Sequence, residues 1–336
     1  MEAHRQVGIR EVARLAGVSR QTVSRVVNDH PSIRPETRER VQKVIDEVGY
    51  RPNRIARMLG ANRSRTLGVI VSNLARSGSG PATALQGIEA AAHAAGYLVH
   101  ITSLSSHSPQ DIEECLALQM DMRVDGLVII APQLKVLRAV EELAPDLPYV
   151  MLNSRHAEDP NQLFVDQVGG ARAATRHLLE LGHRCIAHIA GPQDWLEADA
   201  RMHGYLRELA AWDVEPLPPV LGDWTADFGY VAGLEIARRP EISAVFAAND
   251  STALGLMHAL HERGLDVPGD VSVVGYDDIP EAAHFWPPLT TVAQDFAELG
   301  RRCVAQLLDD QTQGSPLMLP PHVVVRQSTA PPVDRM

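Results

Sequence analysis

Residues 19–25, SRQTVSR, have the types and spacing needed to recognise nucleic acid. Gln21 and Arg25 lie four positions apart, so a helix would present both side chains on one face, flanked by Arg20 and Ser24. Glutamine suits the N6/N7 edge of adenine, and arginine suits the O6/N7 edge of guanine. The segment therefore predicts a helix that reads base edges in the major groove of DNA.

A second set of polar and aromatic residues lies at the ends of apolar runs or in the segments between them. Carboxylates, amides and arginine pair with sugar hydroxyls, while an indole covers the C–H face of a pyranose. The same residue types also serve as caps, turns and packing, so residue type alone leaves both interpretations open. The predicted small-molecule contacts are Ser72, Asn153, Arg201, Trp224, Asn249, Asp277, Gln294 and Phe296.

The first set requires a small helical domain to position it. Gly17 can adopt positive φ between two helices, and Ser19 can cap the second of them. Together with the polar face, this pattern favours an all-α helix-turn-helix head over residues 1–52 rather than an unrelated helical bundle. The apolar positions at helical spacing are Val12, Ala13, Ala16, Val23, Val26, Val27, Val41, Val44, Ile45 and Val48.

Charge is distributed unevenly between this head and the remaining chain. Residues 1–65 hold 14 Lys/Arg against 7 Asp/Glu, whereas residues 66–336 hold 17 against 35. A basic region joined to an acidic body is typical of a module that binds a polyanion, although a solvated basic helix would give the same balance.

The second set requires strands that end at a common edge. Continuous apolar runs, rather than alternating ones, predict strands buried on both faces of parallel sheets, with helices between them. This length favours two doubly wound parallel-sheet subdomains over residues 66–336, with a ligand cleft at the carboxyl ends of the strands. The predicted strands are 67–71, 97–101, 126–130, 149–153, 185–191, 244–249 and 271–277.

Several classes of protein are disfavoured. The three cysteines, Cys115, Cys185 and Cys303, have no CxxC spacing, which fits a reducing compartment. Neither a signal region nor an apolar run of ~20 residues is present, so we expect a cytoplasmic protein without a membrane partner. The motifs GxGxxG, P-loop, GxSxG and HExxH are absent, so we expect a protein that is not an enzyme and binds no cofactor or metal. His258 and His261 share a helix face, which we expect to be exposed to solvent.

Residues 51–60, RPNRIARMLG, predict a very short helix between head and core. Pro52 and Asn53 favour its start and Gly60 its end. A helix of so few residues is marginal in water, because its nucleation costs more than its hydrogen bonds return.

The N-terminal motifs resemble the lactose-repressor (LacI/GalR) family of transcription regulators. They are VARLAGVSRQTVSRVVN and, further along, TRERVQKVIDEVGYRPNRIARML. The resemblance implies that Arg20, Gln21 and Arg25 read base edges. It also implies that residues 53–65 hold a hinge helix that folds when two copies pair on DNA, with Leu59 wedged into the minor groove. The other implied DNA contacts are Ser19, Thr22, Ser24, Asn28, Thr37, Asn53 and Ala56.

The resemblance extends through the core, in HLLELGHRCIAHIAGP, FAANDSTALG, DVSVVGYDDIP and PPLTTVAQDF. It implies a periplasmic-binding-protein-like fold in which Arg201, Asn249 and Asp277 grip effector hydroxyls between Trp224 and Phe296. Through the motifs GDW, VGYDD, PPLTT and QDF, the resemblance also implies a galactoside or another β-linked sugar as effector.

We therefore expect a repressor of a palindromic operator in double-stranded DNA, with affinity lowered by a small sugar. A purine or another metabolite acting as corepressor is the alternative within the same fold. A sugar carrier fits less well because it would not need the basic head. A nicotinamide-dependent enzyme fits less well because the glycine loop that binds the dinucleotide is missing. The C-terminal segment lacks a leucine heptad, so we expect a homodimer.

Overall fold

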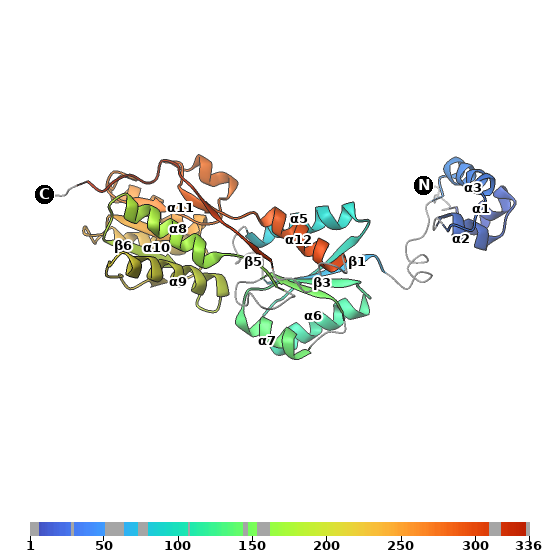
Figure 1. Cartoon of the computed structure of the whole chain (residues 1–336), viewed down its shortest axis with the longest axis horizontal. Coiled ribbons are helices and arrows are strands. Elements are labelled where there is room, and N and C mark those ends of the chain that lie inside the picture. Colours follow the sequence, from blue (N-terminus) through green and yellow to red (C-terminus); the bar gives the residue numbers. More distant parts are fainter. Residues whose placement is uncertain are drawn as a thin grey trace, which may run out of the picture. The chain divides into compact units, whose positions relative to one another are not determined.

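The computed structural model describes residues 7–27, 30–50, 64–72, 80–106, 108–143, 147–152, 162–308 and 317–333. The chain divides into two compact units, Met1–Arg65 and Thr66–Met336 (Figure 1). Four of the predicted DNA contacts, Asn28, Asn53, Ala56 and Leu59, lie outside the described residues, as does the predicted effector contact Asn153.

The first unit contains the predicted helix-turn-helix, formed by α1 (Ile9–Ala16), α2 (Arg20–Val27) and α3 (Pro35–Val48). Gly17 ends α1 at φ 64°, a conformation that glycine adopts without a Cβ clash. The hydroxyl of Ser19 accepts a hydrogen bond from the Thr22 amide at 3.0 Å and so caps α2. The buried core of this unit consists of Val12, Ala13, Ala16, Val23, Val26, Val41 and Ile45.

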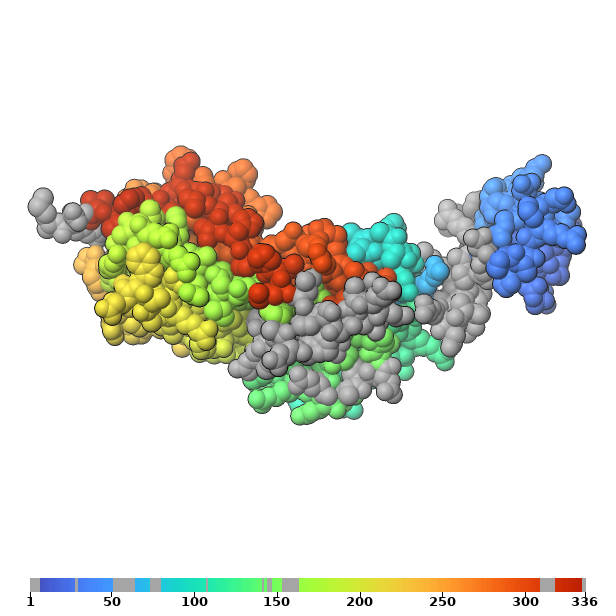
Figure 2. Space-filling view, in the orientation of Figure 1, coloured from blue at the N-terminus to red at the C-terminus, as the bar shows by residue number. Residues whose placement is uncertain are grey.

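The second unit begins with a parallel sheet in the order β11-β5-β4-β3-β1-β2. Its strands are β1 (Thr66–Val71), β2 (Leu98–Ser103), β3 (Gly126–Ile130), β4 (Tyr149–Leu152), β5 (Gln162–Val165) and β11 (Leu317–Leu319). Helices α5 (Gly80–Ala94) and α12 (Phe296–Leu308) pack together, and α6 (Pro109–Asp121) and α7 (Leu134–Leu143) also contact each other. Figure 2 shows α12 in orange-red beside α5 in cyan on the surface.

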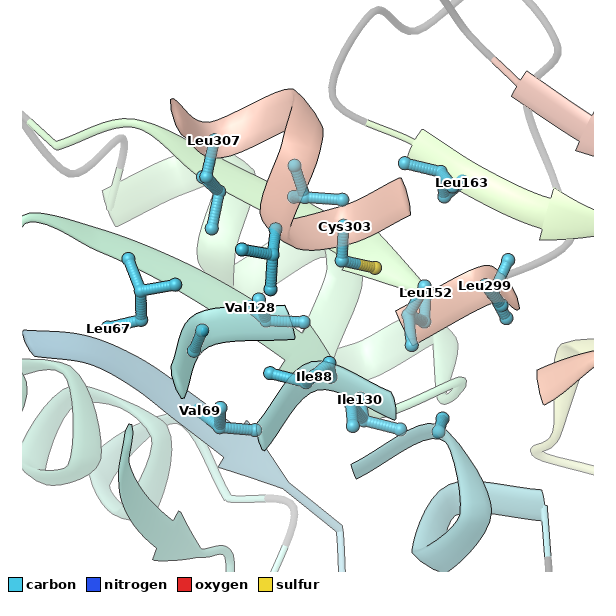
Figure 3. Packing of buried hydrophobic residues seen from close by; sticks show 14 of the residues in the cluster. Leu67, Val69, Ile88, Val128, Ile130, Leu152, Leu163, Leu299, Cys303 and Leu307 are labelled. Atoms are coloured by element: carbon cyan, nitrogen blue, oxygen red, sulfur yellow. The ribbon is translucent and has the colours of Figure 1, made fainter. Parts of the chain in front are cut away.

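Each face of this sheet is covered by one pair of helices. Val69 and Val128 pack with Ile88 of α5 and with Leu299 and Cys303 of α12 (Figure 3). Alternate residues of the same strands, such as Ile70 and Leu127, pack against α6 and α7 on the other face. The predicted doubly wound arrangement is thus confirmed for this subdomain.

The second sheet is also parallel, in the order β7-β6-β8-β9. One of its faces packs against α10 and α11, and the other against α8 and α9. The strands are β6 (Ile186–Ala190), β7 (Val220–Leu221), β8 (Ala244–Ala247) and β9 (Ser272–Val274). The helices are α8 (Gln167–Glu180), α9 (Leu196–Ala211), α10 (Ala226–Ile236) and α11 (Asp250–Glu262). The 3₁₀ helix η2 (Pro280–His284) and the antiparallel pair β10 (Thr291–Ala293) and β12 (His322–Val324) complete the described elements.

One expectation about the strands was wrong. The run 97–101 was expected to be buried on both faces, but Leu98 and Ile101 of β2 are 46% and 47% exposed. The reason is that β2 lies at the edge of the sheet as described, where it pairs with β1. The short strands β5, β7, β10, β11 and β12 were not predicted. No helix in the described ranges is long and apolar enough to cross a membrane.

Candidate functional site

The polar face of α2 is exposed, as base contacts require. Arg20, Gln21 and Arg25 are exposed, while Val23 and Val26 fix the opposite face of the helix in the core. Ser19 is exposed, and Thr22, Ser24 and Thr37 are half-buried. Because α2 is anchored by two valines, its polar side chains form a fixed pattern on the surface of the head.

The core contains a pocket lined by residues from both subdomains, with about 670 Å³ of empty space that is partly open to solvent. Most of its wall is apolar or aromatic. The apolar part includes Pro81, Ala84, Ile130, Leu152, Leu163, Val165 and Leu299, and the aromatic part is Phe164, Trp195, Trp224 and Phe296. The polar side chains in the wall are Gln167, Glu197, Arg201, Asn249 and Asp277. Such a pocket suits a ligand with apolar faces and a few hydrogen-bonding groups.

Arg201 is the centre of the polar part of the wall. Its Nε donates to Gln167 Oε1 at 2.9 Å, and its Nη2 lies 3.2 Å from Asp277 Oδ1. Its Nη1 donates to the backbone carbonyl of Ala248. Gln294 donates from Nε2 to Asp277 Oδ1 at 2.7 Å and accepts from Gln167 Nε2 at 2.7 Å. The result is a closed hydrogen-bonded ring that holds the arginine in one orientation.

The aromatic side of the pocket is fixed by close contacts. The rings of Trp195 and Trp224 meet edge to face, with centroids 5.8 Å apart. The guanidinium carbon of Arg201 lies 5.3 Å from the Trp224 centroid, within cation–π range. A Cβ on Gly191 would come within 2.4 Å of the Trp224 ring, so only glycine leaves room for that indole. Asn249 donates from Nδ2 to the Trp224 carbonyl at 3.0 Å and caps α11 by accepting from the Thr252 amide.

Asp277 follows β9 in an unusual backbone conformation, with φ at 109°. A non-glycine residue there is strained, and such strain commonly occurs at binding sites. Burial raises the pKa of the Asp277 carboxyl, and the neighbouring Arg201 guanidinium opposes that rise. Burial also raises the pKa of Asp250, the first residue of α11, to about 7, although Thr291 and the Ile279 amide donate to its carboxyl.

Comparison with known proteins places this geometry in a family. Residues 8–53 match the lacI family of bacterial regulatory proteins, and residues 175–329 match the periplasmic binding protein-like domain. The chain is 34% identical to the lactose operon repressor of Escherichia coli (strain K12), over 97% of this chain and 91% of the relative. The chain belongs to the lacI family.

Other members of the lacI family are similarly close. The regulator CelR of Thermobifida fusca is 37% identical, covering 98% of this chain and all of CelR. The repressor PurR of Vibrio atlanticus is 34% identical, covering 90% and 91% of the two chains. By name, these relatives are an operon repressor, a transcriptional regulator and a transcriptional repressor.

Solved structures of the lac repressor and of CelR are similar to this chain. The lac repressor dimer bound to operator and the anti-inducer ONPF has a TM-score of 0.88 and 34% identity, covering 97% of this chain and all of that one. The CelR–cellobiose complex has a TM-score of 0.71 and 34% identity, covering 96% and 100%.

The pocket of this lacI-family chain contains most of the predicted effector residues. Arg201, Trp224, Asn249, Asp277 and Phe296 line it.

Two other predicted contacts lie elsewhere. Gln294 is bonded to Asp277 and Gln167 but is not part of the lining. Ser72 is also outside the lining; it is buried, and its hydroxyl donates to Gln133 Oε1 at 2.7 Å.

Four polar or aromatic lining residues were missed, namely Phe164, Gln167, Trp195 and Glu197. Gln167 follows β5, a strand that was not predicted. Trp195 and Glu197 precede Arg201 in the segment WLEADAR. The sequence signal that could have identified Glu197 is its distance of four residues from Arg201, because residues four apart lie on the same face of a helix.

Proposed function

We propose that this chain is a transcriptional repressor that binds a palindromic operator as a dimer and releases it when a galactoside or another β-linked sugar fills the pocket. The observation that carries the proposal is the preformed ring of Arg201, Asp277 and their glutamine partners beside Trp224 and Phe296. Oriented carboxylates and amides match sugar hydroxyls, while aromatic faces match the C–H surface of a pyranose.

The relatives support a β-linked sugar. CelR is similar over its whole length and has been solved with cellobiose, and the lactose operon repressor is similarly close. The aromatic walls would also accept a purine. Because the repressor PurR is among the relatives, purine binding is included as an outcome of the test.

In this proposal the head, residues 1–52, reads DNA through α2. Arg20, Gln21 and Arg25 contact base edges, since their side chains are exposed on one anchored helix. Phosphates are contacted by Ser19, Thr22, Ser24, Asn28 and Thr37, which position the head without reading sequence.

Residues 53–65 act as hinge and linker, in which Asn53 and Ala56 contact DNA and Leu59 enters the minor groove. A segment too short to remain helical alone is stabilised by its partner and by DNA. The sugar prefers the core, residues 66–336, in the form that separates the two hinges. A coupling of ~1–3 kcal/mol between the sites is typical of such proteins.

Thermal-shift titration of the full chain tests the effector class. The panel contains lactose, galactose, cellobiose, xylobiose, adenine and guanine. A ligand at ~100 times its Kd adds ~2.7 kcal/mol to the native state, which raises the melting temperature visibly. A response to one or more of the sugars alone supports the proposal. A response to a purine alone replaces it with a corepressor mechanism, and no response to any sugar contradicts it.

A further inference from the structure

Two polar atoms of pocket residues lack a hydrogen-bond partner within the described ranges. They are Oε2 of Glu197 and Nε1 of Trp224, and both atoms are buried. Native proteins leave few buried polar atoms unpaired, because burial removes their bonds to water. Both atoms belong to residues that line one ligand-sized pocket, so a ligand that enters it could supply the missing partners.

The other polar groups of the wall are largely committed to one another. Asn249 uses its amide nitrogen on the Trp224 carbonyl and its amide oxygen on the Thr252 amide. Arg201 donates to Gln167, to the Ala248 carbonyl and toward Asp277. Glu197 and the indole of Trp224 therefore hold hydrogen-bonding capacity that the protein itself does not use.

Glu197 also determines the charge of the wall. It lies in the first turn of α9, four residues before Arg201 and on the same helix face. The ionisable side chains lining the described pocket are Glu197, Arg201 and Asp277. Because Arg201 is already paired with Asp277, the wall offers no unneutralised cation to an anionic ligand.

We propose that Glu197 selects the effector by contacting two neighbouring hydroxyls of an uncharged saccharide, donating a hydrogen bond to one and accepting from the other. Trp224 Nε1 donates to a further oxygen of the same molecule. The proposal rests on the sugar-responsive function above and narrows it to neutral saccharides, excluding sugar phosphates and sugar acids.

The protonation state of Glu197 agrees with this contact. Burial, and to a lesser extent the nearby Asp277 carboxyl, raise the pKa of Glu197 to about 8. A hydrogen bond from the backbone amide of Glu197 and the Arg201 guanidinium only partly oppose this rise. At pH 7 the carboxyl is therefore protonated in the empty pocket and can donate. Above pH 8 it becomes a carboxylate that a bound saccharide would shield from water, so saccharide binding weakens as the pH rises.

Calorimetric titration of the full chain with cellobiose and with lactose, from pH 6.5 to 9.5, tests the proposal. The variants are Glu197→Gln, which keeps a neutral donor and acceptor, and Glu197→Ala, which keeps neither. Asp199→Asn is the matched control, since Asp199 is in the same turn of α9 but does not line the pocket. Circular dichroism and DNA binding verify that each variant is folded.

We expect the wild-type affinity to fall about tenfold or more between pH 7 and pH 9.5, as the protonated fraction of Glu197 declines. Glu197→Gln should bind within about threefold of wild type at pH 7 without that decline, and Glu197→Ala about tenfold more weakly. Asp199→Asn should follow the wild-type profile.

Three results would overturn the inference. Glu197→Ala binding as tightly as wild type would remove Glu197 from recognition and leave the proposed function intact. A pH profile shared by wild type and Glu197→Gln would reject the donating carboxyl. If glucose 6-phosphate, titrated in the same way, binds in place of the neutral saccharides, this inference alone fails. If none of lactose, galactose, cellobiose and xylobiose binds, or if adenine alone binds, the sugar function and this inference both fail.

Discussion

Arg201 and Asp277 form a buried pair, with Nη2 of the arginine 3.2 Å from Oδ1 of the carboxylate and side chains only 5% and 10% exposed. The arginine comes from α9 and the aspartate from the turn after β9, so the pair joins two elements of the second subdomain at the pocket wall. Burying two charges is costly, and a pair of this kind adds little net stability over an apolar substitute. The pair is therefore better understood as a preformed recognition group.

Arg201→Ala should abolish the saccharide response and destabilise the fold by about 3–5 kcal/mol, because Asp277 is left as an uncompensated buried charge. Arg201→Lys keeps the charge but loses the planar fork, so its loss of stability should be smaller and its saccharide affinity still reduced. Urea unfolding and calorimetric titration measure the two effects. Wild-type saccharide affinity in Arg201→Ala would contradict the assignment.

Gly191→Ala should weaken saccharide binding, since the added Cβ would lie 2.4 Å from the Trp224 ring and force the indole to move. Overpacking of this kind typically costs about 1–3 kcal/mol. Gly8→Ala is the control, because a Cβ there has no neighbour within 4 Å. Trp fluorescence titration with cellobiose and lactose measures the change. Equal affinity in the wild type and Gly191→Ala would show that the position of Trp224 is unimportant.

Gln21→Ala and Arg25→Ala should each weaken binding to the selected operator by about 1–3 kcal/mol, with a smaller effect on random duplex. The operator is first selected from a pool of random duplexes, and anisotropy then gives both affinities. Arg14→Ala serves as control, since Arg14 lies on α1 and pairs with Glu11. Equal losses on operator and random DNA would show that α2 contacts only phosphates.

Glu197 should also make stability depend on pH. Its pKa is about 8 in the folded state and about 4.5 when unfolded, so the folded chain holds the extra proton between these values. Stability from this group therefore falls as the pH rises from 4.5 to 8. Glu197→Gln should match wild type near pH 4.5 and exceed it at pH 8 by about 1–3 kcal/mol. Denaturation at the two pH values measures this, and a pH-independent difference would be inconsistent with a titrating Glu197.

Much of the architecture could be predicted from local sequence. Gly17 and Ser19 marked the turn between α1 and α2, because a positive φ and a side-chain cap depend on residue type. The runs around Val69 and Val128 predicted buried strands, since both faces of the sheet are covered by helices.

The remaining features depend on long-range packing. The edge position of β2 follows from strand order, which its apolar residues do not encode. Ser72 follows β1 as expected, yet its hydroxyl is bonded to Gln133 from a distant part of the chain. Likewise, Glu197 became a candidate only once the fold placed it in the pocket wall with an unpaired oxygen.

The central claim is that filling the pocket releases DNA. It is tested most directly by the anisotropy of a labelled operator duplex with the full chain, with and without the saccharide that shifts the melting temperature. We predict that the saccharide weakens operator binding by about 5–150-fold. In Asp277→Asn, which tolerates the positive φ, operator binding should persist and the response should be lost. Operator affinity unchanged by saccharide in the wild type would contradict the account.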